Sequence, residues 1–305
     1  MVNVIITGAD GFVGSYTTRY FLDQGIAVLG IGRDETPCRL QTHPLLTYMQ
    51  LDVGQINELN DRLAANRYDT FIHFAWDGSA GPARNDYNLQ MSNAVNTVEC
   101  MKAAKKLGCS RFVCAGSIME KEVVAAVNNQ GSRPSMPYIY GTGKLMAHHL
   151  CKCVAADINI DLIWPMITNA YGEGEFSPRF VNTTIRKITN KEKLQFTAAT
   201  QNYDFVYITD VARAFYLIAK NGRPFCEYLI GSSNARPLRD FILEMTAALD
   251  ADVVPEFGDI PFTGIDMPLK TFDTTDTHTD TGFVAEISFS EGIRRTFQWL
   301  STQKG

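Results

Sequence analysis

The chain has 305 residues, of which 45% are hydrophobic and 20% are charged, and its 28 Lys and Arg against 33 Asp and Glu give a net charge of −5. This composition excludes a disordered chain, and the length allows about two domains. The negative charge argues against binding to a nucleic-acid polymer, and no apolar run approaches the roughly 20 residues that cross a bilayer.

Short β-branched runs alternate with helical patterns through the first half of the chain. The runs predict strands at residues 2–7, 26–31, 46–50, 70–74, 111–115 and 161–164, and the helical patterns cover 12–24, 56–66, 87–107 and 140–156. Such alternation is typical of βαβ units, and near-continuous apolar strands fit a parallel sheet covered on both faces. We therefore expect a doubly wound α/β fold.

After Trp164 glycines and prolines interrupt the pattern, which predicts a smaller, partly helical lobe over the carboxyl edge of the sheet. The Thr- and Asp-rich stretch 273–281 lacks the spacing of an EF-hand loop, so we expect a solvated loop there. His148 and His149 would point about 100° apart on a helix, which makes them a poor metal pair. We expect no metal site.

Seven cysteines, an odd number without a CxxC pair, favour a reducing compartment. The first residues read as a strand and show neither the basic segment nor the cleavage site of an export signal. These features indicate a cytoplasmic protein that does not associate with membranes.

The first strand runs into the glycine loop, Thr7-Gly8-Ala9-Asp10-Gly11-Phe12-Val13-Gly14, and then into a helix. Glycines allow a tight turn and close approach of the backbone to a pyrophosphate, and N–H groups at the start of a helix attract phosphates. The position between strand and helix favours a dinucleotide site over a glycine turn without a ligand. The residues assigned to it are Gly8, Gly11, Phe12, Val13 and Gly14.

The end of the second strand bears on the type of dinucleotide. An NAD site usually has an acidic residue there to hold the ribose 2′-hydroxyl, whereas this chain has Gly32 followed by Arg33. A guanidinium beside a missing carboxylate fits the 2′-phosphate of NADP. Asp34 keeps NAD as the alternative, and NADP is preferred.

Tyr140 and Lys144 are four residues apart on a predicted helix and therefore share one face. A nearby ammonium would favour the phenolate form of Tyr140, which can then act as a general acid or base near neutral pH. Ser117 follows the strand at 111–115, at the edge where open α/β sheets bind ligands. Its hydroxyl can hydrogen-bond a carbonyl or an alkoxide.

With these motifs, nearly the whole chain resembles the extended short-chain dehydrogenase/reductase family, which includes nucleotide-sugar epimerases, dehydratases and reductases. The matching segments are the glycine loop, 51–53, 73–75, 93–97, 111–117, Tyr140-Gly-Thr-Gly-Lys144, 169–172, 204–212 and 290–296. The resemblance implies a Rossmann-type fold with cofactor contacts from Asp52, Val53, Phe74, Ala75 and Asn93. It also implies that Asn169 meets the diphosphate of a sugar nucleotide, and that the helices at 87–107 and 140–156 form a four-helix bundle in a homodimer.

Departures from the family narrow this expectation. The 4,6-dehydratases carry an acidic pair after the catalytic hydroxyl, whereas this chain has Ile118 and Met119, which argues against dehydration and leaves two apolar side chains as substrate contacts. Many relatives have Arg where this chain has Tyr203, so the diphosphate would rely on Asn169, backbone amides or Arg179.

The loop after the fourth strand is expected on the substrate side. Trp76 is assigned to cofactor and substrate contacts, and the glycines of residues 78–81 fit either a flexible loop or a lid over sugar and nicotinamide.

The resemblance implies two domains. Residues 1–165, with a returning segment at about 204–232, would form the dinucleotide-binding domain, and residues 166–203 with 233–305 the substrate-binding lobe.

The implied function is NADP-dependent reduction of a nucleotide-activated keto-sugar. Tyr140 would deliver a proton, Lys144 would hold the ribose and Ser117 would fix the carbonyl oxygen. A C4 epimerase that keeps NAD bound would use the same residues and is the alternative. A non-catalytic dinucleotide-sensing protein would have no need of the three residues together.

Overall fold

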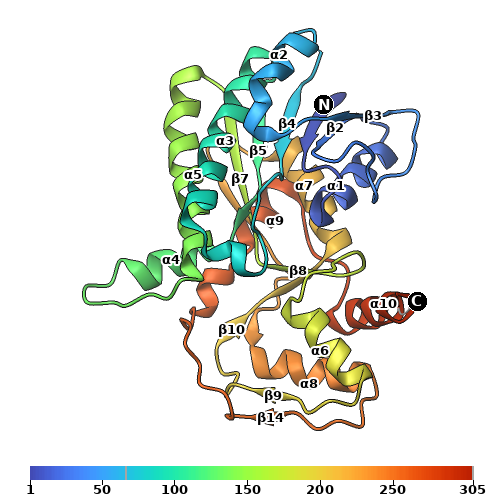
Figure 1. The fold of residues 1–305 in the computed structure, drawn as a ribbon, viewed down its shortest axis with the longest axis vertical. Helices are drawn as coiled ribbons and strands as arrows, with labels where there is room; N and C mark the ends of the chain where they lie inside the picture. The colour runs from blue at the N-terminus through green and yellow to red at the C-terminus, as the bar shows by residue number, and fades with distance from the viewer. Residues whose placement is uncertain (66, 304–305) are drawn as a thin grey trace.

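The computed structural model describes residues 1–65 and 67–303 (Figure 1). A parallel sheet flanked by helices occupies one half of the molecule, and a smaller group of helices and short strand pairs lies at the carboxyl ends of the strands (Figure 1). Within the described residues, no helix combines the length and the apolar character needed to cross a bilayer.

The central sheet is built from strands that all run parallel to their neighbours. They are β1 (Asn3–Thr7), β2 (Ala27–Gly32), β3 (Leu46–Gln50), β4 (Thr70–His73), β5 (Arg111–Cys114), β6 (Gly116–Ser117), β7 (Asp161–Ile167) and β12 (Glu227–Ile230). Their order is β12-β7-β5-β4-β1-β2-β3, with β6 also paired to β7. The order reverses between β1 and β4, which confirms the doubly wound Rossmann-type fold and places the ligand crevice at that point.

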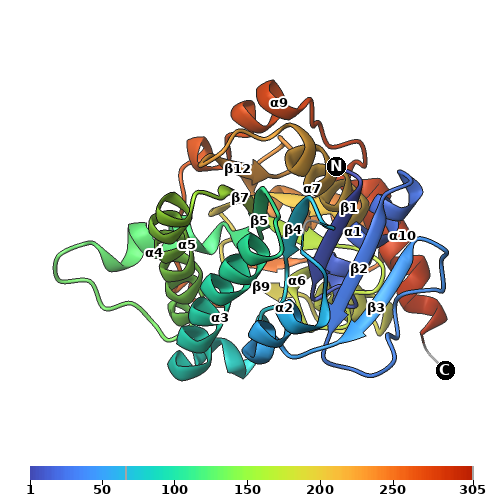
Figure 2. The ribbon, with the colours of Figure 1, turned by 90° about the horizontal axis from the view of Figure 1, so that it is seen from above.

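Helices cover both faces of the sheet, as Figure 2 shows. On one face α3 (Tyr87–Lys106) packs against α5 (Tyr138–Ile158), and on the other α1 (Phe12–Asp23) packs against α7 (Ile208–Asn221). Because both faces are covered, the inner residues of β1, β4 and β5 are wholly buried, which explains their apolar sequences.

The smaller lobe is held together by an aromatic core. Phe205 lies 5.0 Å from Phe241 and 5.5 Å from Phe289, measured between ring centroids. Its helices are α6 (Phe180–Thr189), α8 (Leu238–Ala248) and α10 (Phe289–Thr302), and its strand pairs are β8 (Asn169–Tyr171) with β11 (Phe205–Tyr207), β9 (Gln195–Phe196) with β14 (Glu256–Phe257), and β10 (Asn202–Tyr203) with β13 (Arg236–Pro237).

Two predicted elements have different bounds in the structure. The helix expected at 56–66 is a 3₁₀ turn, η1 (Val53–Glu58), followed by the short helix α2 (Leu59–Arg62). The Asp52 carboxylate accepts the N–H of Gly54 at 2.7 Å and starts the turn early, while residue 66 lies outside the described residues. Strand β7 continues through Pro165, which is possible because β7 no longer pairs with β5 there.

Among the helices that the sequence did not predict individually, two lie where it indicated no helix at all. Helix α4 (Met119–Val127) begins directly after Ser117, and α9 (Thr275–Thr281) replaces the solvated loop expected at 273–281. Thr277 is buried and donates a hydrogen bond to the Leu229 carbonyl at 2.8 Å. The sequence analysis assigned this stretch to the substrate-binding lobe. In the structure α9 packs against β12 and α7, so the stretch lies beside the central sheet instead. Strand β11, expected in the returning segment of the dinucleotide-binding domain, pairs with β8 and packs through Phe205 against the smaller lobe. The other domain boundaries remain a prediction.

Candidate active site

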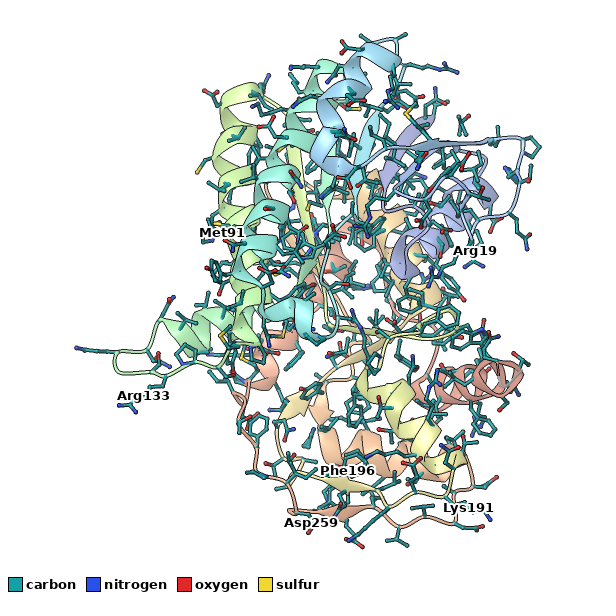
Figure 3. The ribbon with its side chains drawn as sticks, in the orientation of Figure 1. Arg19, Met91, Arg133, Lys191, Phe196 and Asp259 are labelled. Atoms are coloured by element: carbon teal, nitrogen blue, oxygen red, sulfur yellow. The ribbon has the colours of Figure 1, made fainter. Side chains whose placement is uncertain are left out.

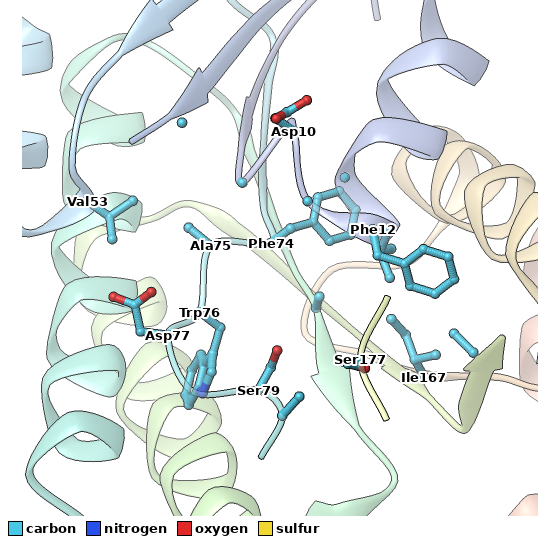
Figure 4. A pocket seen from close by; sticks show the side chains of 18 of the residues that line it. Asp10, Phe12, Val53, Phe74, Ala75, Trp76, Asp77, Ser79, Ile167 and Ser177 are labelled. Carbon is cyan, nitrogen blue, oxygen red and sulfur yellow. The ribbon is translucent and has the colours of Figure 1, made fainter. Parts of the chain in front are cut away.

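A cavity of about 440 Å³ lies at the carboxyl ends of the strands (Figure 4). Fourteen of the predicted site residues line it: Gly8, Gly11, Phe12, Val13, Gly14, Arg33, Val53, Phe74, Ala75, Trp76, Ser117, Tyr140, Lys144 and Arg179. Thus the glycine loop and the three predicted catalytic residues share one cavity. Across the described residues, no three His, Cys, Asp or Glu side chains converge as metal ligands would.

The glycine loop leaves a cradle without side chains. Gly8 has a φ of +66°, and a Cβ on it would lie 2.8 Å from the backbone nitrogen of Ala75. A Cβ on Gly14 would overlap the Gly8 carbonyl oxygen, so the helix can approach the strand this closely only with glycine. Helix α1 starts after Gly11 with no side-chain cap, which leaves N–H groups of its first turn available to an anion. The cradle therefore fits the pyrophosphate of a dinucleotide.

At the end of β2, the Tyr48 side chain occupies the space beside Gly32. A Cβ on Gly32 would overlap the hydroxyl of Tyr48, which donates to the Asp34 carbonyl oxygen at 3.0 Å. Arg33 is exposed and forms an ion pair with Asp77 at 2.8 Å. Arg33 and Asp34 both line the cavity. A cation and a carboxylate therefore lie near the expected position of the ribose that carries the 2′-hydroxyl of NAD or the 2′-phosphate of NADP.

Asp10 and Arg39 also line the cavity, although the sequence did not single them out. The Asp10 carboxylate accepts the backbone N–H groups of Cys38 at 2.8 Å and Arg39 at 2.6 Å. The Arg39 guanidinium donates to the Asp10 carbonyl oxygen at 3.2 Å. These bonds hold the loop after β2 against the glycine loop and bring a second guanidinium to this part of the cavity. Arg39 lies in a segment without periodicity, so no pattern indicated it.

The loop after β4 is anchored to α3. Asn93 accepts the Asp77 N–H at 3.1 Å and donates to the Asp77 carbonyl oxygen at 2.8 Å. Gln90 donates to the Gly78 carbonyl oxygen at 3.2 Å and accepts the indole N–H of Trp76 at 2.7 Å. The hydrogen bonds favour an anchored loop over a flexible one. They also show that Asn93, predicted as a cofactor contact, supports the loop from outside the cavity lining.

The three predicted catalytic side chains are all buried but for the surface that lines the cavity. The Lys144 ammonium donates to the Ala115 carbonyl oxygen at 2.8 Å and lies 3.7 Å from the centroid of a Trp76 ring. The Ser117 hydroxyl oxygen accepts the Met119 N–H at 3.2 Å. Because that bond uses a lone pair of the oxygen, the hydroxyl proton stays available to a substrate oxygen.

A polar cluster beside Tyr140 was missed by the sequence reading. Arg84, from the 3₁₀ turn η2 (Pro82–Asn85), places its guanidinium carbon 4.3 Å from the centroid of the Tyr140 ring. Burial raises the pKa of Glu122, on α4, to about 7, against the opposing effect of Arg84. Burial likewise raises the pKa of Tyr203 to about 12, and nearby Glu122 adds to the effect. Glu122 therefore has a pKa near neutral pH in an environment shared with Arg84 and Tyr203.

Among the predicted substrate contacts, Arg179 lines the cavity and pairs with Glu175 at 3.3 Å. Ile118 is 3% exposed in the core, and its side chain does not reach the cavity. Met119 is half-buried outside the lining. Asn169 donates to the Asp204 carbonyl oxygen at 2.9 Å and ties β8 to β11. Asp52, predicted for the cofactor, caps η1 from outside the lining.

His73 is buried beneath the cavity at the end of β4. Its Nδ1 lies 2.8 Å from the Thr7 hydroxyl and its Nε2 lies 3.2 Å from the Thr97 hydroxyl. Thr97 donates its own proton to the Asn93 carbonyl oxygen, so Nε2 carries the imidazole hydrogen. Burial lowers the pKa of His73 to about 3, and the Lys144 charge acts in the same direction.

We expect His73 to destabilise the fold in acid. The unfolded state binds a proton below its pKa of 6.5, whereas the folded state does not until about 3, so stability is full above 6.5 and falls as pH decreases toward 3. The loss attributable to this group is about 5 kcal/mol at most. Urea unfolding across this pH range should show a shallower dependence in His73→Asn than in the wild type, and equal slopes would contradict the assignment.

Comparisons with known proteins agree with this architecture. The model of the NAD dependent epimerase/dehydratase family matches residues 4–231. A probable dTDP-glucose 4,6-dehydratase of Sinorhizobium fredii is 22% identical over 325 residues, covering 98% of this chain and 92% of the relative.

Solved structures share the fold over the whole chain. MoeE5, solved with UDP-glucuronic acid and NAD, has a TM-score of 0.79 at 23% identity and covers 98% of this chain and 99% of its own. The UDP-glucose 4-epimerase of Thermotoga maritima, solved with UDP-glucose, has a TM-score of 0.80 at 17% identity and covers 100% of both chains.

The family model spans the sheet from β1 to β12 and includes the glycine loop, Ser117, Tyr140 and Lys144. It thereby confirms the resemblance drawn from the motifs. The chain belongs to the NAD dependent epimerase/dehydratase family.

Proposed function

We propose that the protein is an oxidoreductase for a nucleotide-activated sugar, and that it reduces a keto-sugar with NADPH. The observation that supports this is the arrangement of Ser117, Tyr140 and Lys144 around the cavity that begins at the glycine loop. The seven free cysteines suit a cytoplasmic location.

In this proposal the glycine loop holds the pyrophosphate and Lys144 holds the nicotinamide ribose. The dinucleotide, when bound there, would supply the hydride for reduction of the sugar carbonyl. Tyr140 gives its phenolic proton to the carbonyl oxygen as negative charge develops there, and solvent returns the proton to Tyr140. The Ser117 hydroxyl donates a hydrogen bond to the same oxygen and orients the carbonyl. The Trp76 ring of the anchored loop lies 3.7 Å from the Lys144 ammonium and would help to hold it in place.

The preference for NADP rests on the end of β2. Tyr48 fills the place of the acidic side chain that would hold a 2′-hydroxyl, and Arg33 and Arg39 line the cavity. The Arg33–Asp77 ion pair, 2.8 Å long, and the nearby Asp34 are the observations that favour NAD and with it the C4 epimerase as the second candidate. MoeE5 was solved with NAD.

We expect NADPH to bind more tightly than NADH. Arg39→Ala should weaken NADPH binding about tenfold and leave NADH binding nearly unchanged. The variant loses charge-assisted hydrogen bonds to the 2′-phosphate, which NADPH carries and NADH does not. Fluorescence titration of the reduced nicotinamide measures both affinities. Arg19→Ala is the matched control, since Arg19 is absent from the cavity lining described here. Tighter binding of NADH in the wild type would overturn the preference.

Mass spectrometry of the purified protein separates the two candidate functions. An empty cavity supports a reductase that exchanges its cofactor at each turnover, and stoichiometric NAD supports an epimerase. A protein that binds the dinucleotide but turns over no UDP- or dTDP-linked keto-sugar would instead be a sensor.

We propose a homodimer built on α3 and α5. Tyr87, Met91 and Val95 are each more than half exposed at four-residue spacing on α3, and Figure 3 shows Met91 on the outer side of this helix. Met91→Asp would place a charge in the interface and should convert the dimer to a monomer in analytical ultracentrifugation. Leu243→Asp, on an exposed part of α8, should leave the mass unchanged. A monomeric wild type at micromolar concentration would contradict the proposal.

A further inference from the structure

Behind Ser117 lies a buried carboxylate that the proposed mechanism does not use. The Glu120 side chain is 2% exposed. One carboxylate oxygen of Glu120 accepts the backbone N–H of Ser117 at 2.8 Å. Both carboxylate oxygens lie 3.1 Å from the indole nitrogen of Trp164. The second oxygen lies 3.1 Å from Nδ1 of His148. Donors from β6, β7 and α5 thus converge on it, as a buried carboxylate requires.

His148 and Trp164 hold each other in place. Their rings stack at a centroid distance of 4.4 Å with an interplanar angle of 4°, and both side chains are buried. Nε2 of His148 lies 3.9 Å from a carboxylate oxygen of Glu227, which pairs with Lys121 at 2.7 Å. Glu120 is therefore held from α5 and β7 at once and has little freedom to move.

Gly116 shows how closely this cluster packs on the strand that carries Ser117. A Cβ at this position would overlap the indole nitrogen of Trp164 and lie 2.7 Å from a carboxylate oxygen of Glu120. No larger residue fits between the cluster and the strand. The cluster therefore packs directly on the backbone next to Ser117, with no side chain between them.

The two hydrogen bonds at Ser117 fix both its backbone and its side chain. Glu120 accepts the backbone N–H of Ser117. The N–H of Met119, which like Glu120 lies in the first turn of α4, donates to the Ser117 hydroxyl oxygen at 3.2 Å. We propose that Glu120, held by His148 and Trp164, is a positioning residue that sets the orientation of the Ser117 hydroxyl toward the substrate carbonyl. This inference rests on the catalytic role of Ser117 in the proposed function.

The test is a double-mutant cycle of Glu120→Gln with Ser117→Ala, read as kcat per folded molecule with UDP-4-keto-6-deoxy-D-glucose and NADPH. The amide introduced by Glu120→Gln keeps one acceptor oxygen, and its NH₂ group meets the indole N–H of Trp164, which can only donate, so the hydrogen bonds of the cluster must rearrange. We expect Glu120→Gln alone to lower kcat about tenfold, with KM and NADPH affinity within about threefold. In the Ser117→Ala background the same change should have no further effect.

Two further variants keep the inference testable. Trp164→Phe removes only the indole N–H and keeps an aromatic ring against His148, so it should lower kcat by a smaller factor and show the same non-additivity. Glu58→Gln, on exposed η1 and paired with Arg62, is the matched control and should keep the wild-type kcat.

Three outcomes would overturn the inference. Unchanged kcat in folded Glu120→Gln and Trp164→Phe would show that the cluster only stabilises the fold. Fully additive losses with Ser117→Ala would show that it does not act through Ser117. A Ser117→Ala variant with wild-type kcat would remove the catalytic role of Ser117 itself, and so would count against the proposed function as well.

Discussion

Tyr140→Phe should lower turnover by about a hundredfold to ten-thousandfold, because it removes the proton that the proposed mechanism delivers to the carbonyl oxygen. The ring stays under the Arg84 guanidinium and against Trp76, whose ring centroid is 6.2 Å away, so the variant should fold and bind cofactor as the wild type does. Steady-state kinetics with a UDP- or dTDP-linked keto-sugar, together with NADPH titration, measures both effects.

Tyr216→Phe is the matched control for this substitution. Tyr216 lies on α7 on the opposite face of the sheet, where its ring packs 5.5 Å from that of Phe21. We expect its turnover to equal that of the wild type. Retention of full turnover by Tyr140→Phe would remove the tyrosine from the mechanism.

Gly14→Ala should weaken dinucleotide binding about a hundredfold. The added Cβ would overlap the Gly8 carbonyl oxygen, and both partners are backbone, so relief requires α1 to move away from the phosphate cradle. Overpacking of this kind costs about 1–3 kcal/mol. Isothermal titration with NADPH and NADH gives the loss of affinity.

Gly25→Ala provides the comparison for Gly14→Ala. Gly25 has a φ of +74° at the end of α1, and apart from Gly25 and its chain neighbours no heavy atom lies within 4 Å of the Cβ position. Its replacement should cost about 1 kcal/mol of stability through backbone strain alone and leave cofactor affinity unchanged. If Gly14→Ala bound NADPH as tightly as Gly25→Ala does, the glycine loop would not be the phosphate site.

Local sequence patterns were enough to locate the glycine loop, the parallel strands and the helix with Tyr140 and Lys144. These elements are specified by features close together in the chain: an apolar strand, glycines that no other residue can replace, and a spacing of four on a helix. The carboxyl ends of parallel strands meet at one edge, which is why Ser117 and Phe74 could be placed near the glycine loop from sequence.

The orientation of single side chains could not be predicted in the same way. Asn93 and Asn169 point to backbone groups of neighbouring loops, and Ile118 turns into the core, because packing between elements decides these directions. The absence of an acidic residue at position 32 indicated a preference for NADP from the sequence. That the Tyr48 hydroxyl, from β3, occupies the space beside Gly32 can be seen only in the fold.

Short helices and irregular loops were the other source of error. Helix α4 has only nine residues, too few for a clear helical period, and it carries Glu120 and Glu122, which the sequence reading passed over. Helix α9 consists of Thr, Asp and His residues without an apolar face, and only Thr277 and Thr281 are buried, with the Thr277 hydroxyl donating to the Leu229 carbonyl oxygen. Arg39 comes from a loop whose position depends on hydrogen bonds to Asp10.

The most direct measurement is a single-turnover reaction of the protein with UDP-4-keto-6-deoxy-D-glucose and NADPH deuterated at C4 of the nicotinamide, followed by mass spectrometry of the sugar. We predict that the product carries deuterium on the former carbonyl carbon, and that Tyr140→Phe yields little of it in the same time. A product without deuterium, or no reduction of this sugar and its dTDP-linked counterpart by protein shown to bind NADPH, would contradict hydride transfer to a nucleotide-activated keto-sugar.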